Sequence, residues 1–505
     1  FLRAYPELVF ATFQGSRSCT SQGVEQVFAR AKQWLTKGES GDEGQEVLPV
    51  IIFDEIGLAE LSVHNPLKVL HNHLEVENCD VSFVGISNWR LDASKMNRAL
   101  YLARPDPTVP DLAITAKEIL SSFEKTLEGE FQKQIEYLAS AYSEAKKEAD
   151  EVSADLYCLR DFYNLMKLIG REWPADNIIT KKEFFGLVKK SICRNFGGPY
   201  KVSSNVWEKF ITHQKKRVEK IRLPIYSPLD LIESNITAQN SRYLMIITKQ
   251  TSSHLIIERQ LKQYQNRARV MVGSKFKDDS EKEDYAYQTL SEIVLCADRG
   301  IPLILDQMDY IYSSLYDLLN QRFIQVGTQR YCRIALGAHY NPRCYIHRDF
   351  RVVVFLDKSA IKNTDAPLLN RFEKQYFSIK ALMKTGELTI YHQFMEQFER
   401  LGLAKTKKES AAASKFKMSP SEIFLNYSKE LVKLWIYDDK EGLKSEGVAA
   451  VMDYLWKKLI TCATPDFLFW LHQSNFSHSE QQYFEKLYDE THTQTFERIV
   501  RRLMK

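Results

Sequence analysis

Two blocks of the chain alternate short apolar runs with amphipathic stretches, and this pattern predicts parallel β-sheets covered by helices. In the first block, apolar runs at 8–14, 49–54 and 80–88 predict strands, while 24–37 and 66–75 show helical spacing. Strands that are apolar at every position are typical of a parallel sheet buried on both faces. The order strand, helix, strand is that of a βαβ unit.

The second block repeats this organisation after a long helical interval. From 112 to about 194 the apolar spacing is wholly helical. Apolar runs at 243–248, 268–272, 301–306 and 350–357 then predict strands, with a helix at 315–323. Beyond about residue 380 the spacing is helical to the end of the chain.

The two blocks match each other in the order and chemistry of their polar positions, which indicates an internal repeat. In each block one apolar strand ends in Asp, and a later strand ends in a polar residue. Each block then carries a similar septet. The matched features are Asp54 with Asp306, Asn88 with Asp357, and DASKMNR at 92–98 with DAPLLNR at 365–371.

The end of the predicted strand at 49–54 is the strongest candidate for chemistry. Asp54 and Glu55 follow it directly, and ligands of open α/β sheets bind at the carboxyl ends of the strands. An Asp at this place can bind Mg²⁺, and a following carboxylate can orient or deprotonate water. A strand whose end merely carries surface charge is the alternative.

The repeat and its polar residues resemble the AAA+ ATPases, and specifically the giant dynein-like and midasin-like chains with successive ATPase units. The amino-acid sequences at 13–21, 53–60 and 347–355 look most like those of giant RING-finger ubiquitin ligases with a dynein-like core. The resemblance spans essentially the whole chain and is strongest at 8–105 and 295–376. It implies an α/β fold with two tandem AAA+ units, each a parallel P-loop-type sheet domain followed by a helical lid.

That resemblance implies four segments. The first α/β core covers 1–110 and its helical lid 111–224. The second core covers 225–380, and a helical lid or C-terminal helical region covers 381–505.

The resemblance also implies roles for residues of the first unit. Asp54 takes the place of the Walker B aspartate that holds the Mg²⁺ of ATP, and Glu55 that of the residue that polarises the attacking water. Asn88 stands at the sensor 1 position on the neighbouring strand. Arg160, at the start of a helix in the lid, stands at the sensor 2 position, with a solvated surface arginine as the alternative.

Two arginines close the repeated septets at the position of the arginine finger. Arg98 and Arg371 would act in trans, on the nucleotide of an adjacent unit. A guanidinium there spreads its donors over the charge of a transferring phosphoryl group. Arg104 is a second candidate in the first unit, and the sequence does not rank it against Arg98.

Both units depart from the family pattern, because no G-x-x-x-x-G-K-[ST] loop occurs in the 505 residues. For the first unit we expect truncation, since Phe1 precedes the strand that follows this loop in the family. In the second unit the strand at 243–248 stands at the expected place without the glycines that permit close backbone approach. Gln307 and Asp357 replace the catalytic Glu and the sensor Asn, which predicts a silent unit that can still donate Arg371.

Composition limits the partners and the compartment. The net charge is +4, from 69 basic and 65 acidic residues, too balanced to indicate a nucleic-acid partner. The basic run at 213–222 lacks interleaved aromatics and is expected to be a solvated helix face. No run of 18 apolar residues predicts a transmembrane helix. The eight cysteines form no C-x-x-C pair, which indicates the cytosol, and association with lipid droplets is implied by resemblance only.

A zinc site is a weaker prediction than a β-hairpin near the end of the second core. Cys332, His339, Cys344 and His347 fall within 16 residues, but their spacing is not that of a common zinc site. The alternating pattern beside them favours a hairpin insertion instead.

The sequence therefore predicts an ATP-binding and ATP-hydrolysing motor segment of a multi-unit ring, with neighbouring AAA+ units of the same chain as partners. By resemblance, the parent molecule would also transfer ubiquitin. A ubiquitin-conjugating enzyme and ubiquitin would then bind through regions outside this segment. A non-catalytic ring scaffold and a midasin-like remodelling chaperone are the alternatives.

Overall fold

The computed structural model describes residues 5, 7–16, 19–38, 47–77, 79–125, 130–152, 156–199, 201–214, 223–249, 253–265, 267–274, 276, 279, 283–336, 342–403, 418–425, 427–438 and 447–492. The chain divides into two compact units. Unit 1 comprises 1–226, 231–247 and 258–375, and unit 2 comprises 227–230, 248–257 and 376–505. Unit 1 contains the first α/β block, the helical interval and most of the second α/β block.

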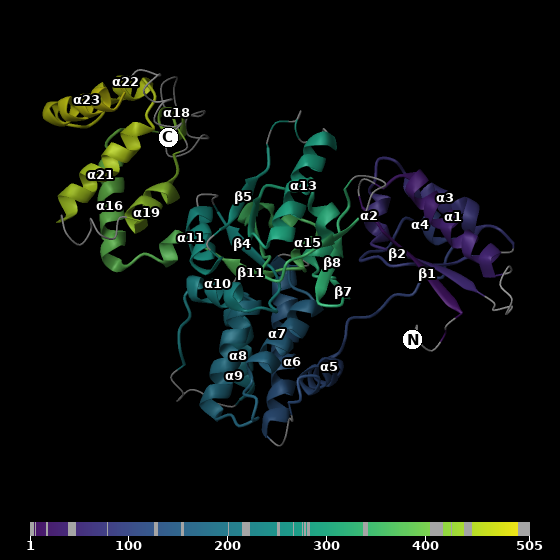
Figure 1. Cartoon of the computed structure of the whole chain (residues 1–505). Coiled ribbons are helices and arrows are strands. Elements are labelled where there is room, and N and C mark those ends of the chain that lie inside the picture. The colour runs from purple at the N-terminus through teal and green to yellow at the C-terminus, as the bar shows by residue number, and fades with distance from the viewer. Residues whose placement is uncertain are drawn as a thin grey trace. The chain divides into compact units, whose positions relative to one another are not determined.

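The first α/β block, here called the first core, is built on a three-stranded sheet (Figure 1). Its strands are β1 (Leu8–Gln14), β2 (Leu48–Asp54) and β3 (Ser82–Gly85), in the order β1-β2-β3. Both neighbours of β2 run parallel to it. Its helices are α1 (Ser21–Gly38), α2 (Ile56–Glu60), the 3-10 turn η2 (Pro66–Lys68), α3 (Val69–Leu74) and α4 (Ala93–Met96).

An apolar cluster between the sheet and its helices stabilises the first core. Phe28 of α1 is 1% exposed and packs with Phe53 of β2 and Leu70 of α3 in one buried cluster. Such a fully buried side chain contributes about 1.5–3 kcal/mol relative to an exposed one. The predicted strands at 8–14 and 49–54 are confirmed.

The second α/β block, here called the second core, has a five-stranded sheet in the order β11-β4-β10-β6-β5. The strands are β4 (Leu244–Thr248), β5 (Arg269–Val272), β6 (Leu303–Asp306), β10 (Val352–Asp357) and β11 (Glu373–Tyr376). Both β5 and β10 run parallel to β6. Its helices are α10 (Pro228–Thr237), α11 (His254–Gln265), α13 (Glu283–Arg299), η4 (Tyr312–Leu315), α14 (Tyr316–Leu319), η5 (Lys358–Asn363) and α15 (Ala366–Leu369).

The strand register confirms the internal repeat position by position. Gln14 pairs with Asp54 at the end of β2, and Val272 pairs with Asp306 at the end of β6. When the register of β3 with β2 and of β10 with β6 is continued along the chain, Asn88 and Asp357 fall at equivalent positions of the two blocks. The two septets also fold alike, since each contains one short helix, α4 or α15.

A small antiparallel sheet is inserted into the second core, as the sequence predicts. It contains β7 (Ile324–Val326), β8 (Gln329–Arg333) and β9 (Arg343–Tyr345). Cys332 and Cys344 are cross-strand partners in it. His339 lies outside the described residues, and among the residues that are described no cluster of His, Cys, Asp or Glu suits a metal.

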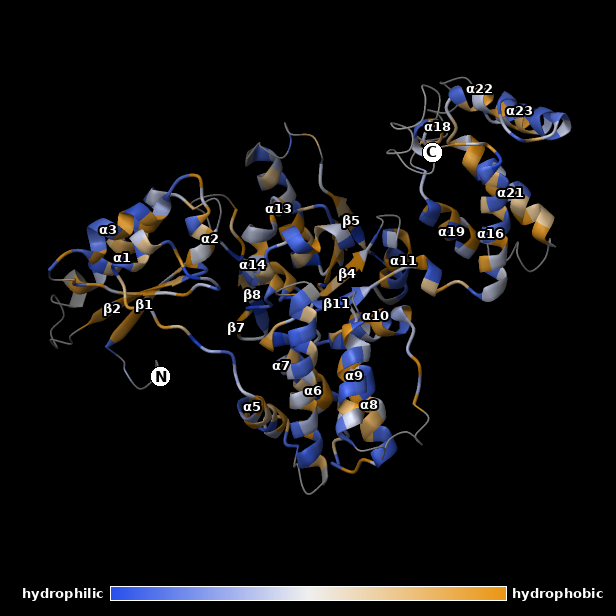
Figure 2. Cartoon of the chain, turned by 180° about the vertical axis from the view of Figure 1, so that it is seen from behind, coloured by the Kyte–Doolittle hydropathy of each residue, from blue (hydrophilic) through white to orange (hydrophobic). Residues whose placement is uncertain are grey.

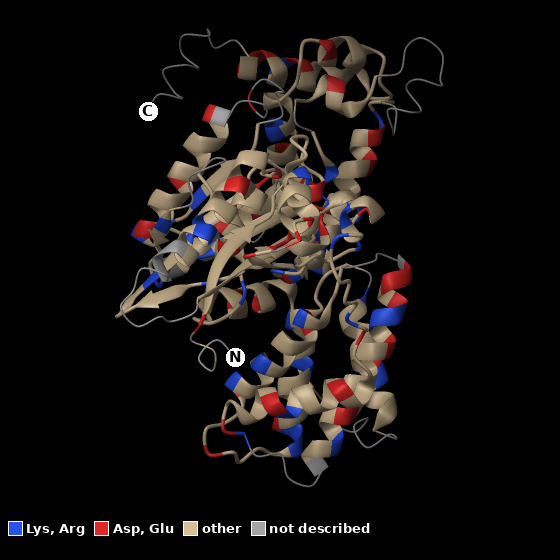
Figure 3. Cartoon of the chain, turned by 90° about the vertical axis from the view of Figure 1, so that its right-hand side faces the viewer, with Lys and Arg blue, Asp and Glu red and all other residues tan. Residues whose placement is uncertain are grey.

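The helical interval forms α5 (Val109–Ser121), α6 (Glu130–Val152), α7 (Leu159–Glu172), α8 (Lys181–Asn195) and α9 (Val202–His213). Figure 2 shows hydrophilic and hydrophobic positions alternating along these helices, as expected of amphipathic helices that pack together. Acidic and basic residues are likewise interspersed in Figure 3. Of the basic run at 213–222, residues 215–222 lie outside the described part of the chain.

Buried ion pairs attach this helical segment to β11 of the second core. Arg194 of α8 donates from Nε and Nη2 to the two carboxylate oxygens of Glu373, each at 2.9 Å. Asp161 of α7 lies 3.4 Å from Lys374 and 2.9 Å from Arg242. Asp161 and Lys374 are both 0% exposed. Pairing of this kind is required because an isolated buried charge is strongly unfavourable.

Beyond residue 378, unit 2 is helical in its described part, as predicted. It contains η6 (Ile379–Ala381), α16 (Thr385–Glu399), α18 (Pro420–Ile423), α19 (Lys429–Asp438), α21 (Gly447–Thr461), α22 (Asp466–His472) and α23 (His478–His492). Phe398, Phe424 and Trp456 are buried and pack against one another. Residues 493–505 lie outside the described part. No described helix is long and apolar enough to cross a lipid bilayer.

Candidate functional site

The carboxyl end of β2 presents Asp54 and Glu55 through an unusual backbone turn. Glu55 has φ 52° and ψ 40°, in the left-handed region, which is uncommon for a residue with a side chain. The amide of Gly15 donates to the carbonyl of Asp54 at 2.7 Å. A Cβ on Gly15 would lie 2.2 Å from the carbonyl oxygen of Glu55. Only glycine therefore fits beside this turn.

Glu55 lies between an amide and a guanidinium. The side-chain nitrogen of Asn88 donates to Oε2 of Glu55 at 2.8 Å. Nη2 of Arg371 lies 3.4 Å from Oε1 of Glu55. Burial raises the pKa of Glu55 and the positive charge of Arg371 opposes the rise, with a net shift upward. A carboxylate with such a raised pKa is suited to accept a proton from water.

Arg371 reaches the first core from the second, out of the turn that follows α15. Its guanidinium carbon lies 3.7 Å from the centroid of the Tyr316 ring, in cation–π geometry. It also donates to the carbonyl of Pro367. Burial lowers the pKa of Arg371 to about 10, so it is positively charged at neutral pH. Its Nε is buried and has no hydrogen-bond partner.

Arg322 is a second cation from the second core at this site, and the sequence alone does not predict it. Nη1 of Arg322 lies 2.8 Å from Oδ2 of Asp54. Burial lowers the pKa of Arg322. The hydrogen bond to Asp54 and the negative charge of Asp54 raise that pKa by more, so the net shift is upward. The predicted helix at 315–323 ends early, since α14 ends at Leu319. Arg322 therefore lies in a turn and not on a helix.

The other predicted arginines occupy different surroundings. Arg160 begins α7 and donates to Asn320 at 3.1 Å, and its charge lowers the pKa of both Glu55 and Arg371. It is close to the site without a described bond to Glu55. Arg98 instead pairs with Glu75 on the surface of the first core, and Arg104 is exposed.

The equivalent strand end of the second core has the same backbone and different side-chain contacts. Gln307 has φ 57°, and a Cβ on Gly273 would lie 1.8 Å from its carbonyl oxygen. Asp357, equivalent to Asn88, accepts hydrogen bonds from the amide and hydroxyl of Ser359 and so caps η5. The turn geometry is repeated, whereas the carboxylate and amide pair of the first core is not.

The residues at the first strand end fit a nucleotide with its magnesium ion. Carboxylate oxygen is the ligand that Mg²⁺ prefers, and Asp54 supplies it. Arginine is suited to phosphate oxygens, and the buried Nε of Arg371 is a donor without a partner in the structure. The phosphate-cradling loop G-x-x-x-x-G-K-[ST] is not among the 505 residues.

Comparison with protein families defines the class. The model described as "RNF213 AAA domain" matches residues 1–111, and a second model of the same description matches residues 233–383. The chain therefore contains two AAA domains, the first around Asp54 and the second around Asp306. AAA domains imply nucleotide binding.

Full-length relatives then identify the particular protein that this chain is similar to. It is 28% identical over 92% of its length to E3 ubiquitin-protein ligase RNF213 of Homo sapiens. The corresponding protein of Mus musculus is 27% identical over 92% of the chain, and rnf213-beta of Danio rerio is 29% identical over 83%. The chain is thus homologous to RNF213, also called mysterin, and spans 8–9% of the length of these relatives. The predicted resemblance and tandem fold are confirmed.

Proposed function

We propose that the first AAA domain is an ATPase and that the second is a silent domain that supplies its arginine finger. One observation carries this proposal: Glu55 accepts from Asn88 of its own core and lies 3.4 Å from Arg371 of the next. A general base, a polar positioning group and a cation that stabilises phosphoryl charge thus meet at one carboxylate. This is the set of groups that ATP hydrolysis requires.

Each residue then has a defined task. Asp54 would hold Mg²⁺, and Glu55 would accept the proton of the attacking water. Asn88 fixes the orientation of Glu55 through its 2.8 Å hydrogen bond. Arg371 would stabilise charge on the transferring group, and Arg160 would approach the phosphates from the lid. Bound ATP with its metal supplies the phosphoryl group and the divalent charge.

Arg322 adds a positioning role at the same strand end. Its guanidinium lies within 2.8 Å of the Asp54 carboxylate, where it fixes that side chain and ties the turn after α14 to β2. Asp317 lies 3.7 Å from the same nitrogen of Arg322. The position of Asp54, the proposed Mg²⁺ ligand, would thus depend on Arg322 of the second core.

We propose the second domain as catalytically silent because its side chains cannot repeat this chemistry. Gln307 is a neutral amide and cannot act as a base. A carboxylate at Asp357 would repel a phosphate, and in the structure it caps η5. The strand β4 leads into Lys249 without a glycine-rich turn.

The activity of the whole protein is a separate part of the proposal. By homology with an E3 ubiquitin-protein ligase, the segment would belong to a cytosolic chain that transfers ubiquitin. The ubiquitin-conjugating enzyme and ubiquitin would bind outside these 505 residues. All eight cysteines are free thiols, which agrees with a reducing compartment.

The substitution Glu55→Gln in the full-length protein tests the ATPase. It keeps the size and the hydrogen bond to Asn88 but removes the base. We expect ATP turnover to fall by about 10²–10⁴-fold, the usual contribution of a general base, while nucleotide binding measured by calorimetry persists.

The matched control is Gln307→Glu at the repeated position. It should give no new turnover, because the second core lacks the amide of Asn88 and the glycine-rich turn. Unchanged turnover in Glu55→Gln would contradict the proposal and favour a non-catalytic scaffold.

A further inference from the structure

The guanidinium of Arg322 lies beside two carboxylates that belong to different cores. Its Nη1 is 2.8 Å from Oδ2 of Asp54, in the first core, and 3.7 Å from Oδ1 of Asp317, in the second. The first distance is that of a hydrogen bond, whereas the second is too long for one. In the structure Arg322 is therefore bonded to Asp54 and lies next to a second acceptor.

This second acceptor is buried and unsatisfied. Asp317 is 6% exposed, and its Oδ2 accepts from Nε of Arg333 at 3.1 Å. Its Oδ1 is buried and makes no hydrogen bond to the described residues, although buried polar atoms nearly always have a partner. A movement of Arg322 by about 1 Å would supply this bond. The oxygen thus marks an alternative position for the guanidinium.

The backbone that carries Arg322 is held in place, so a change of partner requires only its side chain. The amide of Arg322 donates to the carbonyl of Asp317 at 3.0 Å. The preceding residue, Gln321, has φ 56°, and its side-chain nitrogen donates to the carbonyl of Ser241 at 3.1 Å. The side chain of Arg322 is itself 50% exposed, and solvent leaves it room to rotate.

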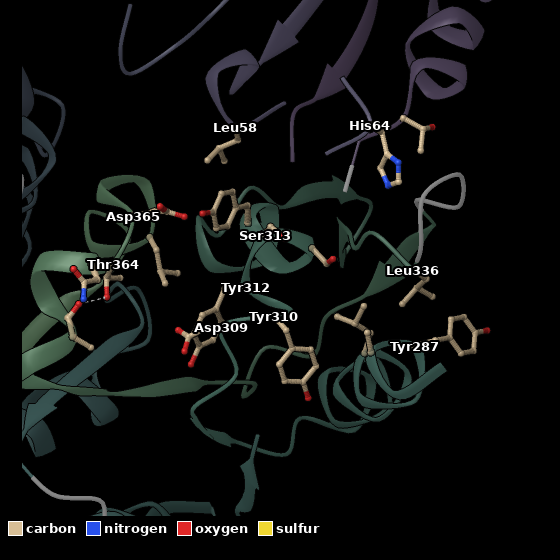
Figure 4. A pocket seen from close by; sticks show the side chains of 18 of the residues that line it. Leu58, His64, Tyr287, Asp309, Tyr310, Tyr312, Ser313, Leu336, Thr364 and Asp365 are labelled. Carbon is tan, nitrogen blue, oxygen red and sulfur yellow. Dashed lines mark hydrogen bonds between the residues drawn. The ribbon is translucent and has the colours of Figure 1, made fainter. Parts of the chain in front are cut away.

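The two cores are not tightly packed beside this turn. A pocket of about 860 Å³ lies against the segment that leads into α14. Figure 4 shows Leu58 and His64 of the first core on one side of it and Tyr312 and Ser313 of η4 on the other. Tyr316, at the start of α14, lines it as well. Polar contacts such as that of Arg322 therefore connect the cores where apolar packing is incomplete.

A divalent cation at Asp54 would oppose the guanidinium. Asp54 is the proposed ligand of Mg²⁺, and Arg322 contacts its Oδ2. The other oxygen, Oδ1, accepts from the backbone amide of Glu55 at 3.0 Å. Like charges a few ångströms apart repel each other, and the repulsion is stronger in a protein than in water. Binding of one cation at this carboxylate therefore weakens binding of the other.

We propose that Arg322 and the metal ion compete for the carboxylate of Asp54, and that Asp317 accepts Arg322 when Asp54 binds the metal. Arg322 then lowers the metal affinity of the first domain, and Asp317 favours its release. Occupation of the metal site in the first core would thus change a contact within the second. This inference rests on the proposed role of Asp54. It goes beyond the positioning role of Arg322, because it predicts that loss of Arg322 strengthens metal binding.

Calorimetry of the full-length protein with a non-hydrolysable ATP analogue, in Mg²⁺ and in EDTA, is the direct experiment. The ratio of the two dissociation constants measures how much the metal strengthens binding. We expect Arg322→Ala to raise this ratio about fivefold, the largest effect usual for a partly exposed ion pair. Arg322→Lys keeps a cation and should restore most of the original ratio.

Asp317→Asn tests the receiving carboxylate. It keeps the shape of the side chain and removes the charge that accepts Arg322, so the ratio should fall. An unchanged ratio would overturn the role of Asp317. Circular dichroism of each variant checks that the fold is intact.

Asp54→Asn separates this inference from the proposed function. The ratio should fall in Asp54→Asn, and Arg322→Ala added to it should have no further effect, because the contact is already lost. If Asp54→Asn leaves the ratio unchanged, Asp54 holds no metal and both proposals fail. If Asp54→Asn lowers the ratio but Arg322→Ala alone does not raise it, the competition is refuted and Arg322 only positions Asp54.

Arg269→Ala is the matched control. Arg269 begins β5 of the second core, is exposed like Arg322, and pairs with Glu292 at 2.7 Å. Its removal therefore breaks an equally short ion pair and removes the same charge without touching Asp54. The ratio should stay unchanged. An increase equal to that of Arg322→Ala would overturn the proposal, since only the net charge would then matter.

Discussion

The two AAA domains share a backbone at their central strand end and differ in what surrounds it. Glu55 and Gln307 both adopt the left-handed conformation, and each abuts the glycine that directly follows the neighbouring strand, β1 or β5. Glu55 is bonded to Asn88, whereas Asp357 turns to Ser359. The two domains thus share the backbone of this turn although their side chains make different contacts. The turn alone therefore does not distinguish the two domains, whereas the contacts of the residue in it do.

A second difference follows the repeated septets. Two residues after Arg371, Glu373 begins β11 and is 2% exposed. Two residues after Arg98, Leu100 is 96% exposed. At this position the second domain buries a polar residue, whereas the first domain exposes an apolar one. The reason is Arg194, which supplies the partner that Glu373 needs in order to be buried.

The largest effect is expected from Arg371→Ala compared with Arg98→Ala. Removal of an arginine finger costs about 10³–10⁵-fold in turnover, and Arg371 contacts Glu55 whereas Arg98 contacts Glu75. Steady-state ATP hydrolysis of the full-length protein measures both. Arg371→Lys keeps the charge but loses the planar fork, so it should restore activity only in part.

Two outcomes would break this comparison. Equal losses from Arg371→Ala and Arg98→Ala would mean that both septets serve active sites. Unchanged turnover in Arg371→Ala, with the fold verified by circular dichroism, would remove the finger role.

The next effect is expected in stability, from Glu373→Ala compared with Leu100→Ala. Glu373→Ala leaves the buried Arg194 with only the carboxylate of Glu172, whose Oε1 lies 3.4 Å from Nη1. We expect most of the cost of breaking a buried ion pair, which is about 3–5 kcal/mol. Leu100→Ala changes an exposed side chain and should stay within about 0.5 kcal/mol. Urea denaturation of the 505-residue chain measures both free energies of unfolding. A cost below about 1 kcal/mol for Glu373→Ala would show that the ion pair is dispensable.

The smallest effect is expected from Gly15→Ala and Gly273→Ala. In each case the new Cβ would meet a backbone carbonyl, at 2.2 Å and 1.8 Å respectively, so the backbone must shift at a cost of about 1–3 kcal/mol. Similar losses of thermal stability would confirm that the two turns are equivalent. Gly186→Ala is the control, because nothing lies within 4 Å of its Cβ position and alanine favours the helix interior.

The sequence predicts the strands and the residues that the repeat aligns, because apolar runs and matched spacing are local properties. Asp54, Glu55, Asn88 and Arg371 could therefore be singled out, and the structure brings them together. The sequence alone could not predict Arg322, because the importance of this residue comes from a contact with Asp54, 268 positions away. It also missed β11, because Glu373, Lys374 and Gln375 have the polarity of a surface segment and are buried only by pairing with distant residues.

The Arg194–Glu373 pair also bears on how the chain is synthesised. Its two members are 179 residues apart. At a translation rate of about 5–20 residues per second, roughly 10–40 s separate their emergence from the ribosome. During that interval Arg194 of α8 has Glu172 of α7 as a carboxylate partner at 3.4 Å and lacks the two shorter bonds to Glu373. The helical segment should therefore complete its packing only after the second core has been made, and the nascent chain should expose this surface to chaperones until then.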